Sequence, residues 1–488
     1  MNITKKLFMA VACAALAWAA TSCADGVELE SYDSGVRNKQ LSAPQLDASC
    51  FTTQNSTDAT YTIMSWPVVY GAGGYLVNVD IVDDPSNPIA VVNDSIVDGC
   101  SLRFVQQEDT KYQITIQTMA NEKLGNTASE VLVYNDYTTL VAAIVVPRGQ
   151  DLAAFVKANL KTGTQDVQAF ELEAGATYEV GDTIAFGLQP VQLRSDKNSH
   201  ATIVLKDKAC ITTQAPLTVK FLNFDCENTT AAPISLDPNP DASLYYDQPV
   251  WQAKYGGNQK VYFLDGDIIL KDCIFREVKG MFFSGSKANW ALTNLNINNC
   301  IVEGDYSTNE AFISMYGAST GTILNLIISN TTFYNLQENS SGYFLRLSNA
   351  SNATPTKIYG PTGRGSVTVL NTTFVRMLTG THWWNNYPQS GITFTMKRNI
   401  FYDTWLLQKA IRNNTADFSA SDNVIWGVTN EVDATDKAKY ATEEDPGFSV
   451  PTSSAINFND PYYGLKSYFT PTKGIAASRQ YGDPRYFE

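Results

Sequence analysis

Three charged side chains stand at equivalent places in a repeated stretch of the sequence, and their types could carry out an elimination reaction. Arg376 and Asp403 each follow the last apolar residue of a repeat by two positions, and Glu277 has the same place in an earlier copy. Removing the C5 proton of a uronic acid needs a base, and a cation such as Ca²⁺ must neutralise the sugar carboxylate. We expect Arg376 to be the base, with Asp403 and Glu277 as Ca²⁺ ligands, although three or more repeats separate these carboxylates. The alternative is a solvated edge in which Arg376 and Asp403 form a surface ion pair.

A segment rich in aromatic residues lies between two of the repeats and could contact carbohydrate. Residues 381–388 read THWWNNYP, and a further tryptophan follows one repeat later. The faces of aromatic rings attract the positive C–H edges of sugar rings, while imidazole and amide groups bond hydroxyls. Packing of the segment against the core is the alternative, because adjacent side chains of an extended chain point to opposite sides. The candidate sugar-contacting residues are His382, Trp383, Trp384, Tyr387 and Trp405.

Copies of one four-residue motif position these side chains. Each copy has Asn or Asp (Arg in one copy), then two residues that are mostly small or β-branched, then a large apolar residue. The closing apolar residues are 27, 31, 41, 27 and 24 residues apart. A fixed motif at irregular spacing predicts a solenoid whose turns differ in loop length. The copies are DCIF (272–275), NCIV (299–302), NTTF (330–333), NTTF (371–374), RNIF (398–401) and DNVI (422–425), with a weaker one, NFDC (223–226), upstream.

The Asn or Asp at the first position of each motif predicts a tight corner in a coil of parallel strands. Asn and Asp tolerate the left-handed backbone conformation that such a corner needs, and amides stacked above one another can form a ladder. Arg398 departs from this pattern and predicts a local bulge. Cys273 and Cys300 hold one position in successive copies, which favours a column of small core residues over a disulfide. Antiparallel strands with Asn-rich turns are the alternative, but two-residue hairpin signals are scarce.

The N-terminal residues predict export and lipidation. Lys5 and Lys6 precede an apolar run that ends in the sequence ATSC, so residues 1–22 are expected to be a signal peptide. The ending resembles a bacterial lipobox, which implies that Cys23 becomes lipidated; ordinary secretory cleavage is the alternative. Residues 23–42 are polar and predict a tether, and their acidic start is similar to the signal that sends some Gram-negative lipoproteins to the cell surface. This implies a lipid-anchored, surface-exposed protein of the outer membrane.

Composition sets limits on the number of domains and on the partners. The chain has 488 residues, of which 44% are apolar, and this predicts two or three domains with ample core. Its net charge of −14 argues against nucleic acid as a partner, since no basic region is concentrated enough to replace phosphate counterions. An anionic glycan would require Ca²⁺ or a local strip of cations, whereas a neutral glycan would not.

Residues 43–137 contain short alternating runs separated by turn signals, which predict a β-sandwich. This stretch resembles a fibronectin type III domain. Trp66 matches the tryptophan in the core of the second strand of that family, and Tyr112 matches the tyrosine whose hydroxyl bonds to an earlier loop. The resemblance implies a spacer.

Residues 138–488 resemble a right-handed parallel β-helix of the pectate-lyase-like superfamily. An amphipathic segment at 151–160 is expected to be the capping helix, and the stretch EAGATYEV (173–180) is expected to be an early strand. The final GDPRY (482–486) is similar to the tail of an uncharacterised family of such surface proteins, in which Arg485 beside Asp483 could fix the tail. The fold class expected for the chain is therefore all-β, with a sandwich followed by a parallel β-helix.

These features favour a polysaccharide as the partner. The fold alone does not determine what the protein does with it. The expected function is that of a cell-surface lipoprotein that binds a plant-type, pectin-like polysaccharide containing uronic acids. If the protein is an enzyme, Ca²⁺-assisted β-elimination is favoured over glycoside hydrolysis, because the fingerprints of galacturonan hydrolases are missing. The alternative is a non-catalytic glycan-binding or adhesion protein that uses the aromatic segment.

Overall fold

Two compact units, Met1–Val141 and Ala142–Glu488, make up the chain, and we call them the N-terminal unit and the parallel unit. The computed structural model describes residues 35–57, 59–246, 261–285, 287–307, 310–317, 321–338, 342–347, 355–358, 363–377, 391–404, 417–427 and 441–488. The predicted signal peptide, Cys23 and most of the predicted tether lie outside these residues. No helix in the described part of the chain is long and apolar enough to cross a membrane.

The N-terminal unit contains two antiparallel sheets with a common apolar core. Alternating buried residues along the central strands produce this core, which includes Trp66 and Tyr112. One sheet has the order β1 (Phe51–Asn55), β2 (Thr60–Ser65) and β5 (Ser101–Val105). The other has the order β4 (Ile89–Val97), β3 (Tyr75–Ile81), β6 (Tyr112–Thr118) and β7 (Leu132–Tyr134).

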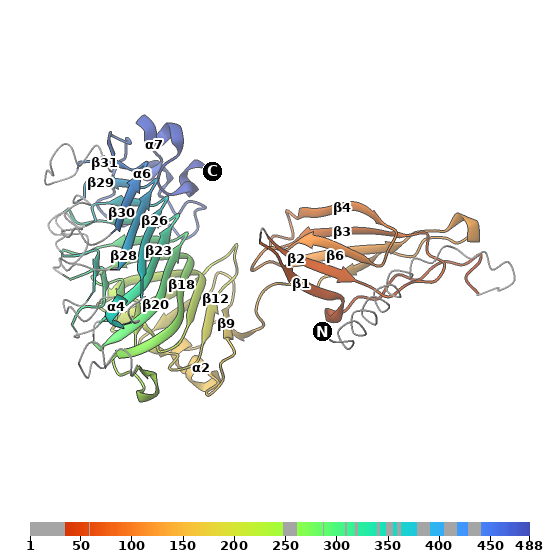
Figure 1. The fold of residues 1–488 in the computed structure, drawn as a ribbon, viewed down its shortest axis with the longest axis horizontal. Helices are drawn as coiled ribbons and strands as arrows, with labels where there is room; N and C mark the ends of the chain where they lie inside the picture. The colour runs from red at the N-terminus through yellow and green to blue at the C-terminus, as the bar shows by residue number, and fades with distance from the viewer. Residues whose placement is uncertain are drawn as a thin grey trace, which may run out of the picture. The chain divides into compact units, whose positions relative to one another are not determined.

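The parallel unit consists of successive turns whose strands pair in parallel with those of the next turn, and it is compatible with a parallel β-helix (Figure 1). Its largest sheet has 19 strands in two columns, because β15 (Leu217–Thr229) and β18 (Val261–Val278) run through both. Besides these two strands, the first column has β9 (Gln168–Leu172), β12 (Val191–Arg194), β20 (Trp290–Asn298), β23 (Thr322–Ser329), β26 (Gly365–Leu370), β28 (Ile392–Lys397) and β30 (Asp417–Ser421).

The second column and a smaller sheet complete the turns. The second column adds β10 (Thr177–Val180), β13 (Ala201–Asp207), β21 (Ile301–Gly304), β24 (Thr332–Asn335), β27 (Thr373–Val375), β29 (Ile400–Tyr402), β31 (Val424–Trp426) and β32 (Thr442–Glu443). The smaller sheet has β11 (Ile184–Ala185), β14 (Ile211–Thr213), β16 (Ile234–Leu236), β19 (Phe283–Ser284), β22 (Ile313–Ser314) and β25 (Leu345–Arg346). Strand β8 (Ala143–Val146) pairs with β9, and β17 (Tyr245–Tyr246) pairs antiparallel with β18.

The corner between the two columns confirms the stacking predicted from the repeats. The opening residue of every one of the six copies has a left-handed backbone, with φ between 47° and 60°. The strands on both sides of the corner are paired in register, so these residues lie above one another. The Asn299 amide donates to Asp272, and Asn371 Nδ2 donates to Asn330 Oδ1 at 3.2 Å. The polar corner residues therefore form part of the ladder that the sequence predicted.

Two details of the predicted corner are wrong. Arg398 causes no bulge: it takes the left-handed conformation itself, with φ 60°, and the register on both sides of it continues. In the upstream copy the corner residue is Phe221, with φ 55°, because Leu222 pairs with Cys273. Asn223 therefore lies two places beyond the corner, in the outward-facing part of β15. The sequence pattern does not indicate Phe221 as the corner residue because an aromatic residue is rare at a left-handed corner.

Two segments with strong turn signals contain strands. The stretch from Asp265 to Asp267 lies within β18, where Gly266 (φ 148°) accompanies a shift of register against β20. The Pro-rich stretch from Asn228 to Lys260 includes β16, which belongs to the smaller sheet. Strand β18 contains Gly266, and β16 directly follows Pro233. Gly and Pro are ordinarily turn signals.

Stacked side chains fill the interior of the parallel unit. The ring centroids of Phe333 and Phe374 are 5.4 Å apart, and those of Phe374 and Phe401 are 5.0 Å apart, with nearly parallel planes. Cys273 and Cys300 are buried free thiols in one column, as predicted. Helix α2 (Leu152–Asn159) is capped by Asp151 and contributes Leu152 and Val156 to the same core. Each turn thus buries a surface that it could not bury alone.

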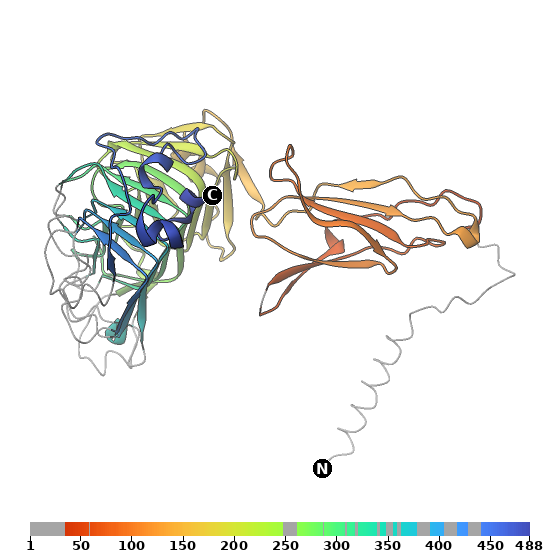
Figure 2. The same cartoon turned by 90° about the horizontal axis from the view of Figure 1, so that it is seen from above.

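A C-terminal segment, residues 441–488, covers the outer side of the second column (Figure 2). The segment includes α6 (Lys466–Phe469) and α7 (Gly474–Arg479). The short helix α4 (Pro355–Ile358) lies elsewhere in the chain, before β26. Phe469 packs against Tyr334 with ring centroids 5.1 Å apart. Farther along, Asp483 accepts a hydrogen bond from Thr332 and pairs with Arg485. The outer side of the second column is therefore a second apolar core.

Candidate functional site

Arg376 and Asp403, two of the residues predicted to carry out chemistry, contact each other. Both have a left-handed backbone directly after β27 and β29, which places their side chains above one another. Arg376 Nε lies 3.2 Å from Asp403 Oδ2, and its Nη2 lies 3.5 Å from Glu338 Oε1. The guanidinium therefore contacts two carboxylates. A base would instead need access to a substrate proton.

Glu277 stands in the same column but contacts other partners. Its Oε2 lies 2.9 Å from Lys279 Nζ, and the same ammonium lies 2.7 Å from Asp305 Oδ2. Four strand-to-strand steps of about 4.8 Å separate Glu277 from Asp403, so the two carboxylates do not share one ion. Within the described residues, no group of three or more His, Cys, Asp and Glu side chains could hold a metal.

The aromatic segment predicted to contact sugar lies outside the described residues. This holds for all five of its candidates, His382, Trp383, Trp384, Tyr387 and Trp405. Their role in carbohydrate contact stays a prediction.

A buried acid that the sequence did not indicate lies under the C-terminal segment. Glu303 faces outward on β21 yet is fully buried, and it accepts hydrogen bonds from Tyr334, from Ser454 Oγ at 2.6 Å and from the Glu277 amide at 3.3 Å. Burial raises the pKa of this carboxyl above its ordinary value. No local pattern signals this, because the covering Ser454 is 151 residues away in the chain.

The raised pKa of Glu303 predicts how its replacement changes stability with pH. A carboxyl whose pKa is higher in the folded state binds protons more tightly there, so its stabilising effect is full below the unfolded pKa of about 4.3 and is lost as pH rises. The variant Glu303→Gln has no such group. Its thermal unfolding midpoint relative to the wild type is therefore expected to be higher at pH 8 than at pH 4.5. Glu179→Gln, at an exposed ion pair with Lys206, is the control and should show no such trend.

The outward side chains of the first column form a mainly polar, partly exposed surface that also includes Ile269 and Ile327, and we call it the polar face. Along β28 buried and solvent-facing residues alternate, which directs every second residue outward. Amide and hydroxyl groups on successive strands bond to one another: Asn294 to Asp267 at 2.5 Å, Asn325 to Asn294 at 2.9 Å, and Ser366 to Asn325 at 2.9 Å. Figure 1 shows the strands that carry this face side by side. The polar side chains of this face are those of Asp267, Asn294, Asn296, Asn325, Ser366, Thr368, Thr393 and Thr395.

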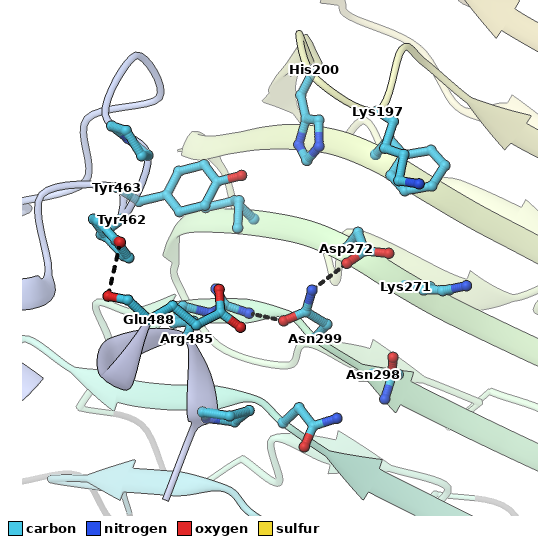
Figure 3. Close-up of a pocket in the computed structure, with 15 residues that line it drawn as sticks. Lys197, His200, Lys271, Asp272, Asn298, Asn299, Tyr462, Tyr463, Arg485 and Glu488 are labelled. Atoms are coloured by element: carbon cyan, nitrogen blue, oxygen red, sulfur yellow. Dashed lines mark hydrogen bonds between the residues drawn. The ribbon is translucent and has the colours of Figure 1, made fainter. Parts of the chain in front are cut away.

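A cavity of about 510 Å³ lies where the corner meets the C-terminal segment, and we call it the corner pocket (Figure 3). Its volume is within the range of about 300–1,000 Å³ that is usual for small-molecule sites. Phe221 and His200 line it, and Tyr463 extends toward His200 from the C-terminal segment. Burial raises the pKa of Tyr463 to about 12, which keeps its hydroxyl protonated, and burial lowers the pKa of His200, which favours the uncharged ring.

Both the fold and these surfaces define a class: an all-β protein whose parallel strands present a polar face and a pocket at one corner. Residues 3–181 match a domain of unknown function, DUF4992, and residues 176–336 match a second one, DUF4957. The first match extends past the boundary between the two units and ends just after β10. No protein with a curated description and no solved structure is significantly similar to the chain.

Proposed function

We propose that the protein binds a plant-type polysaccharide containing uronic acids at the surface of a Gram-negative cell. The polar face is the observation that carries this proposal. Strands about 4.8 Å apart repeat the same kinds of side chain along the coil, and a polymer repeats its hydroxyls in a similar way. Amides suit such a ligand because each of them can donate and accept hydrogen bonds.

The rest of the chain fits a surface protein. In this proposal, lipid on Cys23 anchors it to the outer membrane, and the N-terminal unit is a spacer of fibronectin type III type. The hydroxyl of Tyr112 accepts a hydrogen bond from the Gln107 amide at 2.7 Å, which resembles the tyrosine corner of such sandwiches. The parallel unit is then a right-handed β-helix of the pectate-lyase-like superfamily, with the polar face available to the glycan.

Binding is better supported than cleavage. The predicted elimination needs Arg376 as a base and Ca²⁺ held by Asp403 and Glu277, but each of these side chains lies in an ion pair with a neighbour. A non-catalytic glycan-binding protein needs neither group. In this proposal the corner pocket and the aromatic segment add contacts to those of the polar face.

Affinity electrophoresis of the mature chain tests the proposal. We expect its migration to be retarded in gels that contain polygalacturonate or pectin, and unaffected by gels without polysaccharide. Unchanged migration across a panel of uronic and neutral polysaccharides would contradict the proposed function. Absorbance from unsaturated product, after incubation with polygalacturonate and Ca²⁺, would show that the protein also cleaves.

A further inference from the structure

Two aromatic residues in the corner pocket adopt a backbone conformation that is unfavourable for them. Phe221 and Tyr463 have φ angles of 55° and 56°, in the left-handed region, where bulky residues are rare. In the six repeats Asn, Asp or Arg takes the position of Phe221. Such strain concentrates at functional sites. Two strained aromatic residues from segments 242 positions apart in the chain line one cavity, which makes it a candidate binding site.

The aromatic rings of His200, Phe221 and Tyr463 line the pocket and offer apolar surface to a ligand ring. The ring centroid of His200 is 6.1 Å from that of Phe221 and 6.5 Å from that of Tyr463. Figure 3 shows Tyr463 directed from the C-terminal segment toward His200. Among the described residues, no hydrogen bond involves the Tyr463 hydroxyl, so it can donate to a ligand without first breaking an internal contact.

The pocket also carries groups that match sugar hydroxyls. Asn298, Asn299 and Asn330 supply amides from two successive strand ends and their corners. Asp272 and Glu488 supply carboxylates, which accept hydrogen bonds from hydroxyl groups. A sugar ring presents both kinds of surface, an apolar edge and a rim of hydroxyls.

Lys197, Lys271 and Arg485 line this pocket beside the acidic residues Asp272 and Glu488, in a chain whose net charge is −14. Arg485 Nε lies 3.2 Å from Asp483 and its Nη2 donates to Asn299 at 2.7 Å, while its Nη1 is buried without an acceptor among the described residues. Buried unsatisfied donors are costly, so Arg485 favours a ligand that brings an acceptor, such as a carboxylate.

We infer that the corner pocket binds a carboxylate-bearing sugar residue, with its ring against Tyr463 and its carboxylate toward the cations that line the pocket. This inference rests on the proposed function, because it takes the ligand to be a glycan. It adds a second contact site, separate from the polar face, that selects the acidic sugar. The pocket thereby supplies the local cations that an acidic protein needs in order to hold an anionic polymer.

Calorimetric titration of the mature chain tests this assignment with two probes, trigalacturonate and its fully methyl-esterified, uncharged form. We expect the acid to bind more tightly than the ester. Lys271→Gln should weaken binding of the acid about tenfold or more and leave the ester unchanged, because a charged contact is lost. Tyr463→Phe removes one neutral hydrogen bond and should weaken both probes about 3- to 10-fold. Lys206→Gln, an exposed lysine elsewhere on the coil, is the control and should bind both probes as the wild type does.

The outcomes separate this inference from the proposed function. The inference is overturned if acid and ester bind equally, if Lys271→Gln binds the acid as the wild type does, or if Tyr463→Phe changes neither affinity. In those cases retention of the wild type by polygalacturonate gels would leave the proposed function standing. If neither trisaccharide nor polymer binds, both fall. Unfolding midpoints of both variants should equal that of the wild type, which excludes misfolding as the cause.

Discussion

Replacing Arg485 by Met is expected to lower the free energy of unfolding of the parallel unit by about 3–5 kcal/mol at pH 7. Asp483 is fully buried under the C-terminal segment, and its charge is balanced by the guanidinium 3.2 Å away. Met keeps most of the side-chain volume but leaves the carboxylate unpaired. Burial already raises the pKa of Asp483, so protonation at lower pH should reduce the loss. Denaturant unfolding at pH 7 and pH 5 measures both effects.

A double variant is the control for this prediction. Asp483→Asn combined with Arg485→Met removes both charges, so it should cost less than Arg485→Met alone. Equal losses for the single and the double variant at pH 7 would show that the ion pair does not hold the C-terminal segment in place.

The second large effect is expected at the corner of the coil. Asn371→Val should lower the free energy of unfolding by about 2–3 kcal/mol, because valine is strained at φ 47° and cannot donate to Asn330. Asn371→Gly keeps the left-handed conformation without that strain and should cost clearly less. Denaturant unfolding of the two variants measures the difference. Equal losses would mean that the left-handed corner does not determine which residue is tolerated there.

The repeated motif predicted the core and the corner because both depend on local residue types. A left-handed corner selects Asn or Asp, and an inward position selects a large apolar residue, so each turn repeats the signal. The repeats do not indicate the corner at Phe221, where the residue type departs from what the backbone favours. Strand β18 is equally hard to recognise at Gly266, since a glycine inside a strand resembles a turn signal.

The burial of the second column could not be read from the repeats. Glu303 and Tyr334 look like outward residues of exposed strands, and only the C-terminal segment, about 150 residues later, covers them. The corner pocket has the same origin, since His200 and Tyr463 are brought together by folding alone. Arg376 and Asp403 were predicted from their equal register, and the structure does bring them into contact. Register does not indicate whether such a pair does chemistry, so their catalytic role stays a prediction.

Retention of a polar-face variant in a polygalacturonate gel tests the proposed glycan surface most directly. Asn294→Ala with Asn325→Ala removes two bonded amides that lie on the surface and leaves the apolar core intact. The dissociation constant for the polymer should rise at least about fivefold, because two ligand hydrogen bonds are lost. Gln113→Ala with Asn135→Ala, an exposed amide pair of the N-terminal unit, should bind as the wild type does. Wild-type retention by the polar-face variant would contradict the claim that this surface holds the polysaccharide.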